Sequence, residues 1–357
     1  MAEGDPPTFS IFEEEARAIF GDSPTLELLH EDHLPFAHEA GVFIAEDDTM
    51  FITSNQFKNP VSGRKQIKIS RVKLDRKGGR TTAEAGEINP KGVPMANGGV
   101  NYDGGVLFCA QGEVNCSVEP INDVVVHSDG SIWFTDPPYG YEQGIRPRSI
   151  LPPQVYRFDP KGGVDAKGST RAVADGFGRP NGICFSPDES IVYITDTDYI
   201  HGDGIDWTKP STVYAFDMAT YSGQPFLTNR RLFAFAENGV PDGIKCDVDG
   251  NVYSGCGDGV NVWSPGGVLL GKIRVEGGAA NFCFGNEGEM FILNEKRLWR
   301  ATLGESTKGA LLHGKGEQVP TTKTPAAERT RLAAKRRKEV RLNKRITRAS
   351  MIWQRDN

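Results

Sequence analysis

The stretch RPNGICFSPDESIVYITDTD, residues 179–198, decides the fold of this protein. Pro-Asn-Gly leads into a short apolar run, Ser-Pro-Asp-Glu forms a tight turn, and a second apolar run ends in acidic residues. Two apolar runs joined by such a turn are typical of a β-hairpin. Which fold this hairpin builds depends on whether the pattern recurs along the chain.

The same hairpin pattern occurs six times. An acidic or glycine-containing turn followed by apolar residues is found at 45–55, 101–111, 127–137, 186–196, 247–257 and 285–295. From Asp47 in the first turn to Glu287 in the last there are 240 residues and five intervals, a mean of 48. Repeats of about 40–50 residues with several strands each are typical of propeller blades. The sequence therefore predicts an all-β fold, a six-bladed β-propeller over residues 1–304, and six copies fit an unrepeated β-sandwich poorly.

One interval in this series is too short. Only 26 residues separate Asp103 from Asp129, and four strands of about five residues with their turns do not fit into that length. We therefore expect one incomplete blade, with its least regular part at residues 104–122.

Charge is distributed unevenly along the chain of 357 residues. Residues 305–357 hold 14 Lys/Arg and 5 Asp/Glu, a net charge of +9, which leaves −15 on residues 1–304. We interpret 305–357 as a basic tail outside the propeller, disordered or helical. A nucleic-acid role for the tail is the alternative, and we do not expect nucleic acid as a partner.

Other features of composition limit the class of protein. No apolar run of 18 residues is present, so no membrane segment is expected. The first 20 residues have neither a basic start nor an apolar stretch, which predicts no signal peptide and a cytoplasmic location. The six cysteines form no CxxC pair, which favours buried free thiols in a reducing compartment.

Each hairpin is preceded by a strand that begins with a polar, oxygen-bearing residue. These residues are Glu39, Asn97, Asn122 with Asp123, Asn181, Asp242 and Asn281. The first strand of a propeller blade faces the central channel, so these strand starts would converge at one mouth of it. Two carboxylates and an amide oxygen brought together suit a hard cation. Asn and Asp also begin strands for purely local reasons, so the residues alone leave both interpretations open.

Several segments resemble the SMP-30/gluconolactonase family, most closely its fungal lactonohydrolase branch. They include HEAGVF (38–43), NDVVVHSDGSIWFTDPPYGY (122–141), the opening stretch and VPDGIKCDVDGN (240–251), and the resemblance covers about residues 8–304. It implies a six-bladed propeller that hydrolyses lactones with one divalent cation. It also implies metal ligation by Glu39, Asn181 and Asp242, substrate contact by Asn122, and a supporting position for Asp123.

The chemistry expected of such a site is hydrolysis without a covalent nucleophile, and no GxSxG elbow is present. A divalent cation would polarise the lactone carbonyl and Asp242 would act as general base. Ca²⁺ is the expected ion, with Mg²⁺, Mn²⁺ and Zn²⁺ as alternatives. Tyr139 lies on a loop placed to border the substrate, and we group it with Asn122 and Asp123 as substrate-binding. Asn122 is also counted with Asp242 as a catalytic residue.

The predicted enzyme is thus a gluconolactonase-like hydrolase whose partner is a small lactone. The sequence leaves open which lactone is used and the oligomeric state. A non-catalytic propeller that serves as an interaction scaffold, or a related propeller esterase, is the alternative.

Overall fold

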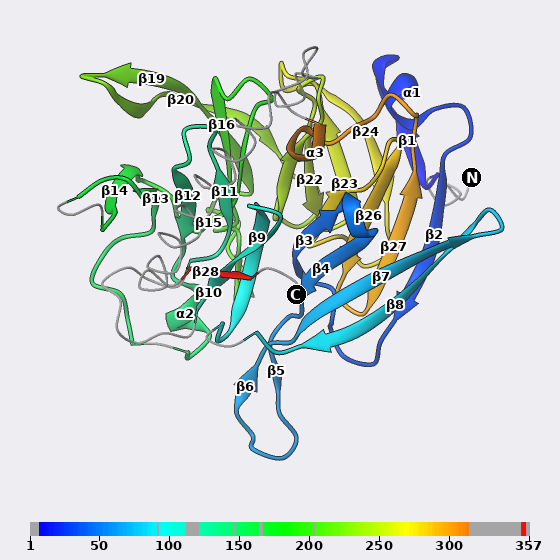
Figure 1. Cartoon of the computed structure of the whole chain (residues 1–357). Coiled ribbons are helices and arrows are strands. Elements are labelled where there is room, and N and C mark those ends of the chain that lie inside the picture. The colour runs from blue at the N-terminus through cyan, green and yellow to red at the C-terminus, as the bar shows by residue number, and fades with distance from the viewer. Residues whose placement is uncertain are drawn as a thin grey trace, which may run out of the picture.

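The structure is a computed structural model that describes residues 7–90, 93–111, 121–145, 147–163, 167–202, 204–313 and 351–354. Strands dominate these ranges, and the prediction of an all-β fold is confirmed (Figure 1). Helices are limited to α1 (Glu15–Phe20), α2 (Tyr139–Glu142), α3 (Ala310–His313) and the 3₁₀ turn η1 (Ala45–Asp47) in the described part. None of these helices has the length and apolar character needed to cross a bilayer.

Three sheets are each built from one continuous stretch of chain, with four antiparallel strands in sequence order. They are β3 (Glu39–Ile44), β4 (Thr49–Thr53), β7 (Ile69–Lys77) and β8 (Arg80–Ile88); β11 (Val124–Val126), β12 (Ile132–Asp136), β13 (Gln154–Asp159) and β14 (Ser169–Ala174); and β15 (Pro180–Phe185), β16 (Ile191–Asp196), β19 (Thr212–Tyr221) and β20 (Gln224–Phe235). The opening stretch of the sequence analysis forms β15 and β16, as its turn residues predicted.

Two further sheets are completed by strands from the N-terminal part of the chain. Their strands are β21 (Ile244–Cys246), β22 (Val252–Cys256), β23 (Gly259–Trp263) and β24 (Leu269–Arg274) with β1 (Phe9–Ile11); and β25 (Asn281–Phe284), β26 (Glu289–Asn294) and β27 (Arg297–Thr302) with β2 (Thr25–Glu31). Both β1 and β2 pair antiparallel on the outer edge of their sheet, so the start of the chain is tied to its later part.

The remaining sheet is the short one. It contains β9 (Ala96–Tyr102), β10 (Gly105–Ala110) and β28 (Met351–Gln354), in the order β28-β10-β9. Of the segment 104–122 that we expected to be irregular, residues 112–120 lie outside the described residues. The described sheet has three strands, whereas the sheets of β3 and β11 on either side of it have four each, and two of its three strands come from this part of the chain.

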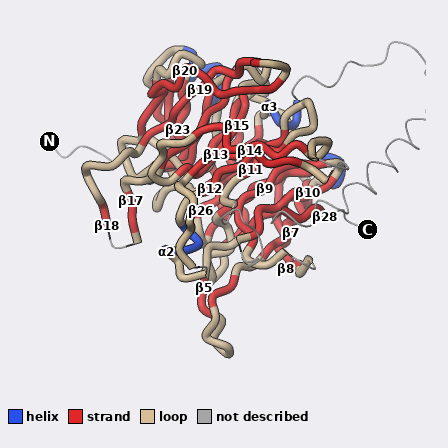
Figure 2. Tube along the Cα trace, turned by 90° about the vertical axis from the view of Figure 1, so that its left-hand side faces the viewer, coloured by secondary structure: helices blue, strands red, loops and turns tan. Residues whose placement is uncertain are grey.

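Strand β28 falls within the tail that we expected to be disordered or helical. It pairs antiparallel with β10 from Val106 to Cys109 and lies beside β10 in both views (Figures 1 and 2). The reason is the short sheet: in the described residues no other strand pairs with this edge of β10, and the N–H and C=O groups of an open edge can be covered by another strand. The tail stretch 326–345 noted for its charge lies outside the described residues.

The first strand of each sheet contacts the first strand of the next. This series runs from β3 through β9, β11, β15, β21 and β25 and returns to β3. Apolar side chains fill the spaces between neighbouring sheets; Trp133, Ile183 and Phe216, for example, share one buried cluster between the third and fourth sheets. The five cysteines in the described ranges are free and buried, while Cys116 lies outside them.

Two short hairpins extend from this body near one end of the first strands. β5 (Phe57–Lys58) pairs with β6 (Lys65–Gln66) in a hairpin that projects from the lower edge in Figure 1. The second pairs β17 (Ile200–His201) with β18 (Gly204–Ile205). Residues from both hairpin regions, together with α2, border the cavity described next.

Candidate active site

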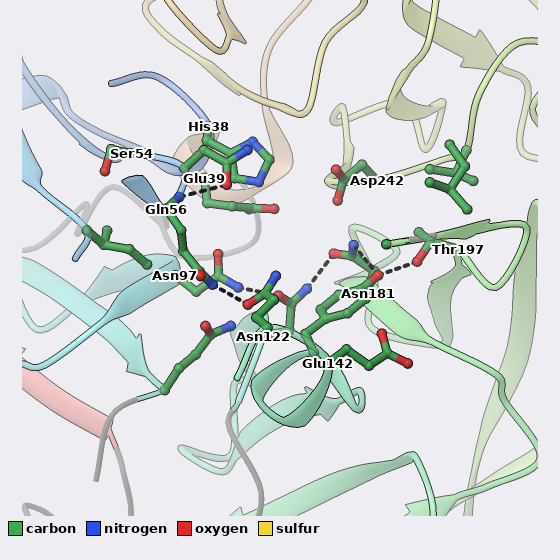
Figure 3. A pocket seen from close by; sticks show the side chains of 18 of the residues that line it. His38, Glu39, Ser54, Gln56, Asn97, Asn122, Glu142, Asn181, Thr197 and Asp242 are labelled. Carbon is green, nitrogen blue, oxygen red and sulfur yellow. Dashed lines mark hydrogen bonds between the residues drawn. The ribbon is translucent and has the colours of Figure 1, made fainter. Parts of the chain in front are cut away.

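A cavity of about 340 Å³ lies where the first strands begin. Figure 3 shows polar side chains from different sheets around this one open space. The predicted residues that line it are Glu39, Asn122, Tyr139, Asn181 and Asp242, together with the strand-start residue Asn97. The structure thus brings five of the six predicted site residues together.

Two of the three carboxylates that line the cavity, those of Glu39 and Asp242, are in an unfavourable environment. Glu39 is 3% exposed, and one of its oxygens, Oε2, accepts a hydrogen bond from Asn281 Nδ2 at 2.7 Å. Asp242 is half-buried, and its Oδ1 is buried without a hydrogen-bond partner in the described part of the chain. Burial raises the pKa of both groups, and the charge of Asp242 raises the pKa of Glu39 further.

A chain of amide groups crosses the cavity wall between the carboxylates. Asn97 Nδ2 donates to Asn122 Oδ1, and Asn122 Nδ2 donates to Asn181 Oδ1 at 2.5 Å (Figure 3). Asn181 Nδ2 donates to the Tyr139 hydroxyl at 3.3 Å, and that hydroxyl is also hydrogen-bonded to Thr197. Each amide is therefore fixed in orientation, and a carbonyl oxygen that accepts one hydrogen bond retains a second lone pair.

Glycines beside the polar residues allow this convergence. Gly182 follows Asn181, and a Cβ there would lie 2.5 Å from the carbonyl oxygen of Asp242 on the neighbouring strand. Gly243 follows Asp242, and a Cβ there would overlap the Asn281 amide. Only glycine permits such a close approach of backbones. The Asn-Gly and Asp-Gly pairs in the sequence are thus packing requirements at the positions where neighbouring first strands meet.

Hydrogen bonds and a bulge also fix the backbone beside Asp242 and Glu39. The Asp242 N–H donates to the Gly255 carbonyl at 2.8 Å, and the Thr195 hydroxyl donates to the Asp242 carbonyl at 2.9 Å. On the other side, β3 has a bulge directly after Glu39, with φ of 66° at Ala40. Bulges re-aim the side chains next to them and are frequent beside functional sites.

Asp123 is the predicted site residue that does not line the cavity. Its Oδ2 accepts a hydrogen bond from the Ile183 N–H at 3.1 Å, and its side chain is buried. Burial raises the pKa of Asp123, against the charge of Lys245 and two backbone hydrogen bonds. Asp123 therefore occupies a supporting position between first strands, and a direct contact with a ligand in this cavity is not supported.

His38 is a cavity residue that the sequence analysis did not select. Its Nδ1 is 2.6 Å from Glu295 Oε1, and Glu295 also accepts hydrogen bonds from Asn55. Burial alone would lower the pKa of His38, but Glu295, with Glu39 and Asp242 nearby, raises it to about 9. The signal available in the sequence was its position directly before Glu39 in HEAGVF.

A second network that the sequence did not reveal holds the wall formed by α2 and the loop after β16. Arg179, which is 7% exposed, makes ion pairs with Glu142 of α2 and with Asp198. Its Nη1 is also 2.8 Å from His201 Nε2. Glu142 and His201 both line the cavity, so one buried guanidinium joins two segments of its wall.

The residues present fit a hard cation. Among the described residues Asp242 Oδ1 has no hydrogen-bond partner, and Glu39 and Asn181 line the same cavity (Figure 3). Within the described ranges, no group of three or more His, Cys, Asp or Glu side chains is arranged to hold a metal by itself. A cation here would therefore need the amide oxygen as a ligand, and oxygen ligands of this kind favour Ca²⁺ or Mg²⁺.

Comparison with known families matches residues 105–296 to the SMP-30/Gluconolactonase/LRE-like region, more than half of the chain. The chain belongs to this family. A gluconolactonase of Zymomonas mobilis is 30% identical over 183 residues, which are 48% of this chain and 47% of that protein. The lactonohydrolase oryH of Aspergillus oryzae is 34% identical over 174 residues, 43% of this chain and 36% of the relative. The chain thus spans about half or less of the curated relatives it matches.

Solved structures of the family are similar over most of the described chain. A gluconolactonase of Xanthomonas campestris has a TM-score of 0.65 and 25% identity, and the match covers 84% of this chain and 96% of that one. Regucalcin of Agrobacterium tumefaciens, described as a calcium-binding protein, has a TM-score of 0.51 and 17% identity, with coverage of 79% and 94%. At that identity, the second likeness concerns the fold alone.

Proposed function

We propose that this member of the family is a metal-dependent lactonase that hydrolyses a sugar lactone of the gluconolactone type to the aldonic acid. The observation that carries the proposal is the unpartnered, buried Asp242 Oδ1, which shares a cavity with Glu39 and with a row of oriented amides. Relatives named gluconolactonase and lactonohydrolase support the reaction class.

The proposed architecture is a six-bladed β-propeller in which the six sheets are the blades. The series of contacts from β3 to β25 and back to β3 supports this arrangement, because the first strands of propeller blades line a central channel and adjoin one another in turn. The sheet of β9 and β10 would be the incomplete blade. We propose that residues 1–304 hold the propeller and that most of 305–357 lies outside it.

Glu39, Asn181 and Asp242 would hold one divalent cation, and Ca²⁺ is the ion we propose. When bound, such an ion supplies Lewis-acid polarisation of the lactone carbonyl and lowers the pKa of water. It would also offset the burial of Glu39 and the charge of Asp242 beside it, which otherwise raise the pKa of Glu39.

The protein side chains have distinct roles in this mechanism. Asn122 and Tyr139 orient the lactone, since their polar groups line the cavity and are held by hydrogen bonds. Asp242 would take the proton of the attacking water at a carboxylate oxygen, as a general base that lines the substrate cavity can. The ring of a lactone already holds its ester in a reactive conformation, so the enzyme needs no covalent intermediate.

The side chains of the cavity wall are suited to a substrate with several hydroxyl groups. Amide and hydroxyl side chains dominate it, among them Ser54, Gln56, Gln111 and Thr197. Such groups can donate to and accept from sugar hydroxyls. The volume of about 340 Å³ also lies within the range of small-molecule sites.

The test combines calorimetric titration with divalent ions and a lactone hydrolysis assay. We expect one Ca²⁺ per chain, and we expect Asp242→Asn to abolish turnover of gluconolactone while the protein stays folded. Asp75→Asn, a change on an exposed hairpin, is the matched control and should leave both unchanged. Full lactonase activity in Asp242→Asn would refute the mechanism, and absence of ion binding in the wild-type chain would favour a non-catalytic scaffold.

A further inference from the structure

A second cavity lies at the opposite end of the first strands. It has a volume of about 610 Å³ and is bordered by residues at the ends of β9, β11, β15 and β21 and by α3. It shares no lining residue with the first cavity. Because β15 runs from Asn181 at one cavity to Phe185 at the other, the two cavities lie at different depths of the same set of strands.

Lys245 contributes a positively charged side chain to this cavity. It is 8% exposed, and it lies on β21 between Ile244 and Cys246, both of which pack into an apolar cluster. Within the residues that the structure describes, no hydrogen bond or ion pair holds its ammonium group, which lies 5.8 Å from the centre of the Phe282 ring. The ammonium nitrogen is not among the fully buried atoms that lack a partner, and Lys245 lines the cavity, so an anion that enters the cavity could pair with it.

Asp123 is a carboxylate within the chain whose charge Lys245 could balance. The charge of Lys245 acts on the Asp123 carboxylate, but the two groups form no ion pair in the described structure. Asp123 instead accepts a hydrogen bond from the Ile183 backbone. The ammonium group is therefore available to a ligand, since Lys245 lines the second cavity and a smaller neighbouring one.

Carboxylates around the same cavity restrict the kind of anion that fits. Asp103 is exposed on the turn after β9. Asp188 accepts hydrogen bonds from the Ser186 and Ser190 hydroxyls, and Glu189 accepts one from the Ser128 N–H at 2.8 Å. These groups repel a ligand with several negative charges but accept hydrogen bonds from hydroxyl groups.

We propose that the second cavity binds a hydroxylated monocarboxylate, such as an open-chain sugar acid, with its carboxylate on Lys245 and its hydroxyls toward Asp103 and Glu189. The volume is sufficient for a ligand of this size. This site does not depend on the proposed hydrolysis, because binding is measured without turnover.

The experiment is calorimetric titration of the full chain with gluconate as the probe. It is done in the Asp242→Asn background to suppress binding at the first cavity. We expect one gluconate site per chain. Lys245→Gln should weaken the affinity for gluconate at least 10-fold. Glucose, which lacks the carboxylate, and acetate, which lacks the hydroxyls, should each bind at least 10-fold more weakly than gluconate. Lys308→Gln is the matched control, because Lys308 lies close to α3 and pairs with Glu287 outside the cavity; it should bind as the parent does.

A measurement on the wild-type chain covers the case in which Lys245→Gln does not fold. Reductive methylation of lysines, followed by mass spectrometry, should slow at Lys245 at least 5-fold in gluconate and stay unchanged at Lys308. Asp103→Asn offers a mild variant, because Asn tolerates the φ of 49° at this position, and it should weaken gluconate binding a few-fold. Equal gluconate binding in Lys245→Gln, or unchanged methylation of Lys245, would overturn the proposal and leave the lysine as a counter-charge for Asp123.

Discussion

Replacing Glu39 with glutamine should stabilise the protein when divalent ions are removed. The Glu39 carboxylate is 3% exposed and faces a second carboxylate across the cavity. Burial, with the charge of Asp242, raises its pKa from an ordinary 4.5 to about 8. A glutamine has nearly the same shape and can accept the same hydrogen bond from Asn281 Nδ2. The substitution therefore removes the unfavourable charge and keeps the packing.

The sign of the pH dependence follows from this raised pKa. Between pH 4.5 and 8 the unfolded chain has lost the Glu39 proton and the folded, ion-free chain still holds it. The unfolded state then binds fewer protons, so the free energy of unfolding falls as the pH rises through this window. Glu39→Gln removes that loss, and its gain in stability should be small at pH 5 and nearly complete at pH 8.

The size of the gain has an upper limit of about 5 kcal/mol, from 3.5 pKa units at 1.36 kcal/mol each. His38 and Asp242 will adjust their own protonation around the new amide, so we expect about 1–3 kcal/mol, as for other buried charges replaced by neutral groups. At roughly 2 °C per kcal/mol for a chain of this size, Tm should rise by about 2–6 °C.

Thermal and urea unfolding in chelator and in excess Ca²⁺ provide the assay. In Ca²⁺ the order should reverse, because the wild-type chain gains about 4.1 kcal/mol at an ion concentration of 1,000 times Kd and the variant gains much less. Loss of more than about 1 kcal/mol by Glu39→Gln in chelator at pH 8 would refute the reasoning, since it would mean that the carboxylate stabilises the ion-free fold.

Three other predictions test the surroundings of the site. Glu289→Gln should lower the free energy of unfolding in urea by about 2–4 kcal/mol above pH 5, because Glu289 is buried and paired with Arg76 and Arg300. These pairs lower the pKa of Glu289, so the difference should disappear as the pH falls through that lowered pKa. Gly182→Ala should weaken Ca²⁺ binding at least 10-fold in titration, because its Cβ would displace the Asp242 backbone, whereas Gly86→Ala, whose Cβ meets only one atom at 4.0 Å, should not. A chain that ends after residue 313 should keep its Ca²⁺ affinity, while one that ends after residue 304 should lose stability, because Thr307 and Leu312 contact the body of the fold.

Much of the fold could be predicted because its signals are local. Each acidic turn with its flanking apolar runs specifies one hairpin. The short interval between Asp103 and Asp129 marked the sheet in which the structure describes only two strands from this part of the chain. The pairing of β28 with β10 was beyond such reasoning. It joins residues more than 240 positions apart, and nothing in the tail sequence indicates which exposed strand edge it covers.

Some residues of the candidate site could likewise be predicted from local sequence, and others could not. Sequence reasoning could select Glu39, Asn181 and Asp242 because each occupies the same place in a repeated unit, and the structure has all three line one cavity. The pairing of His38 with Glu295, 257 residues away, has no counterpart in the repeat and depends on where the first and last sheets touch.

The glycines after Asn181 and Asp242 connect the prediction of the fold with the prediction of the site. Asn181-Gly182 and Asp242-Gly243 are read from sequence as turn-forming pairs, a local interpretation that competes with a role in the site. The structure shows that each glycine lies against the polar residue of the neighbouring first strand, in space that no Cβ fits. The pair therefore does two things at once: its first residue supplies an oxygen to the cavity, and its second lets the next oxygen approach. A polar residue followed by glycine at the same position of successive repeats is consequently a stronger indication of a shared site than the polar residue alone.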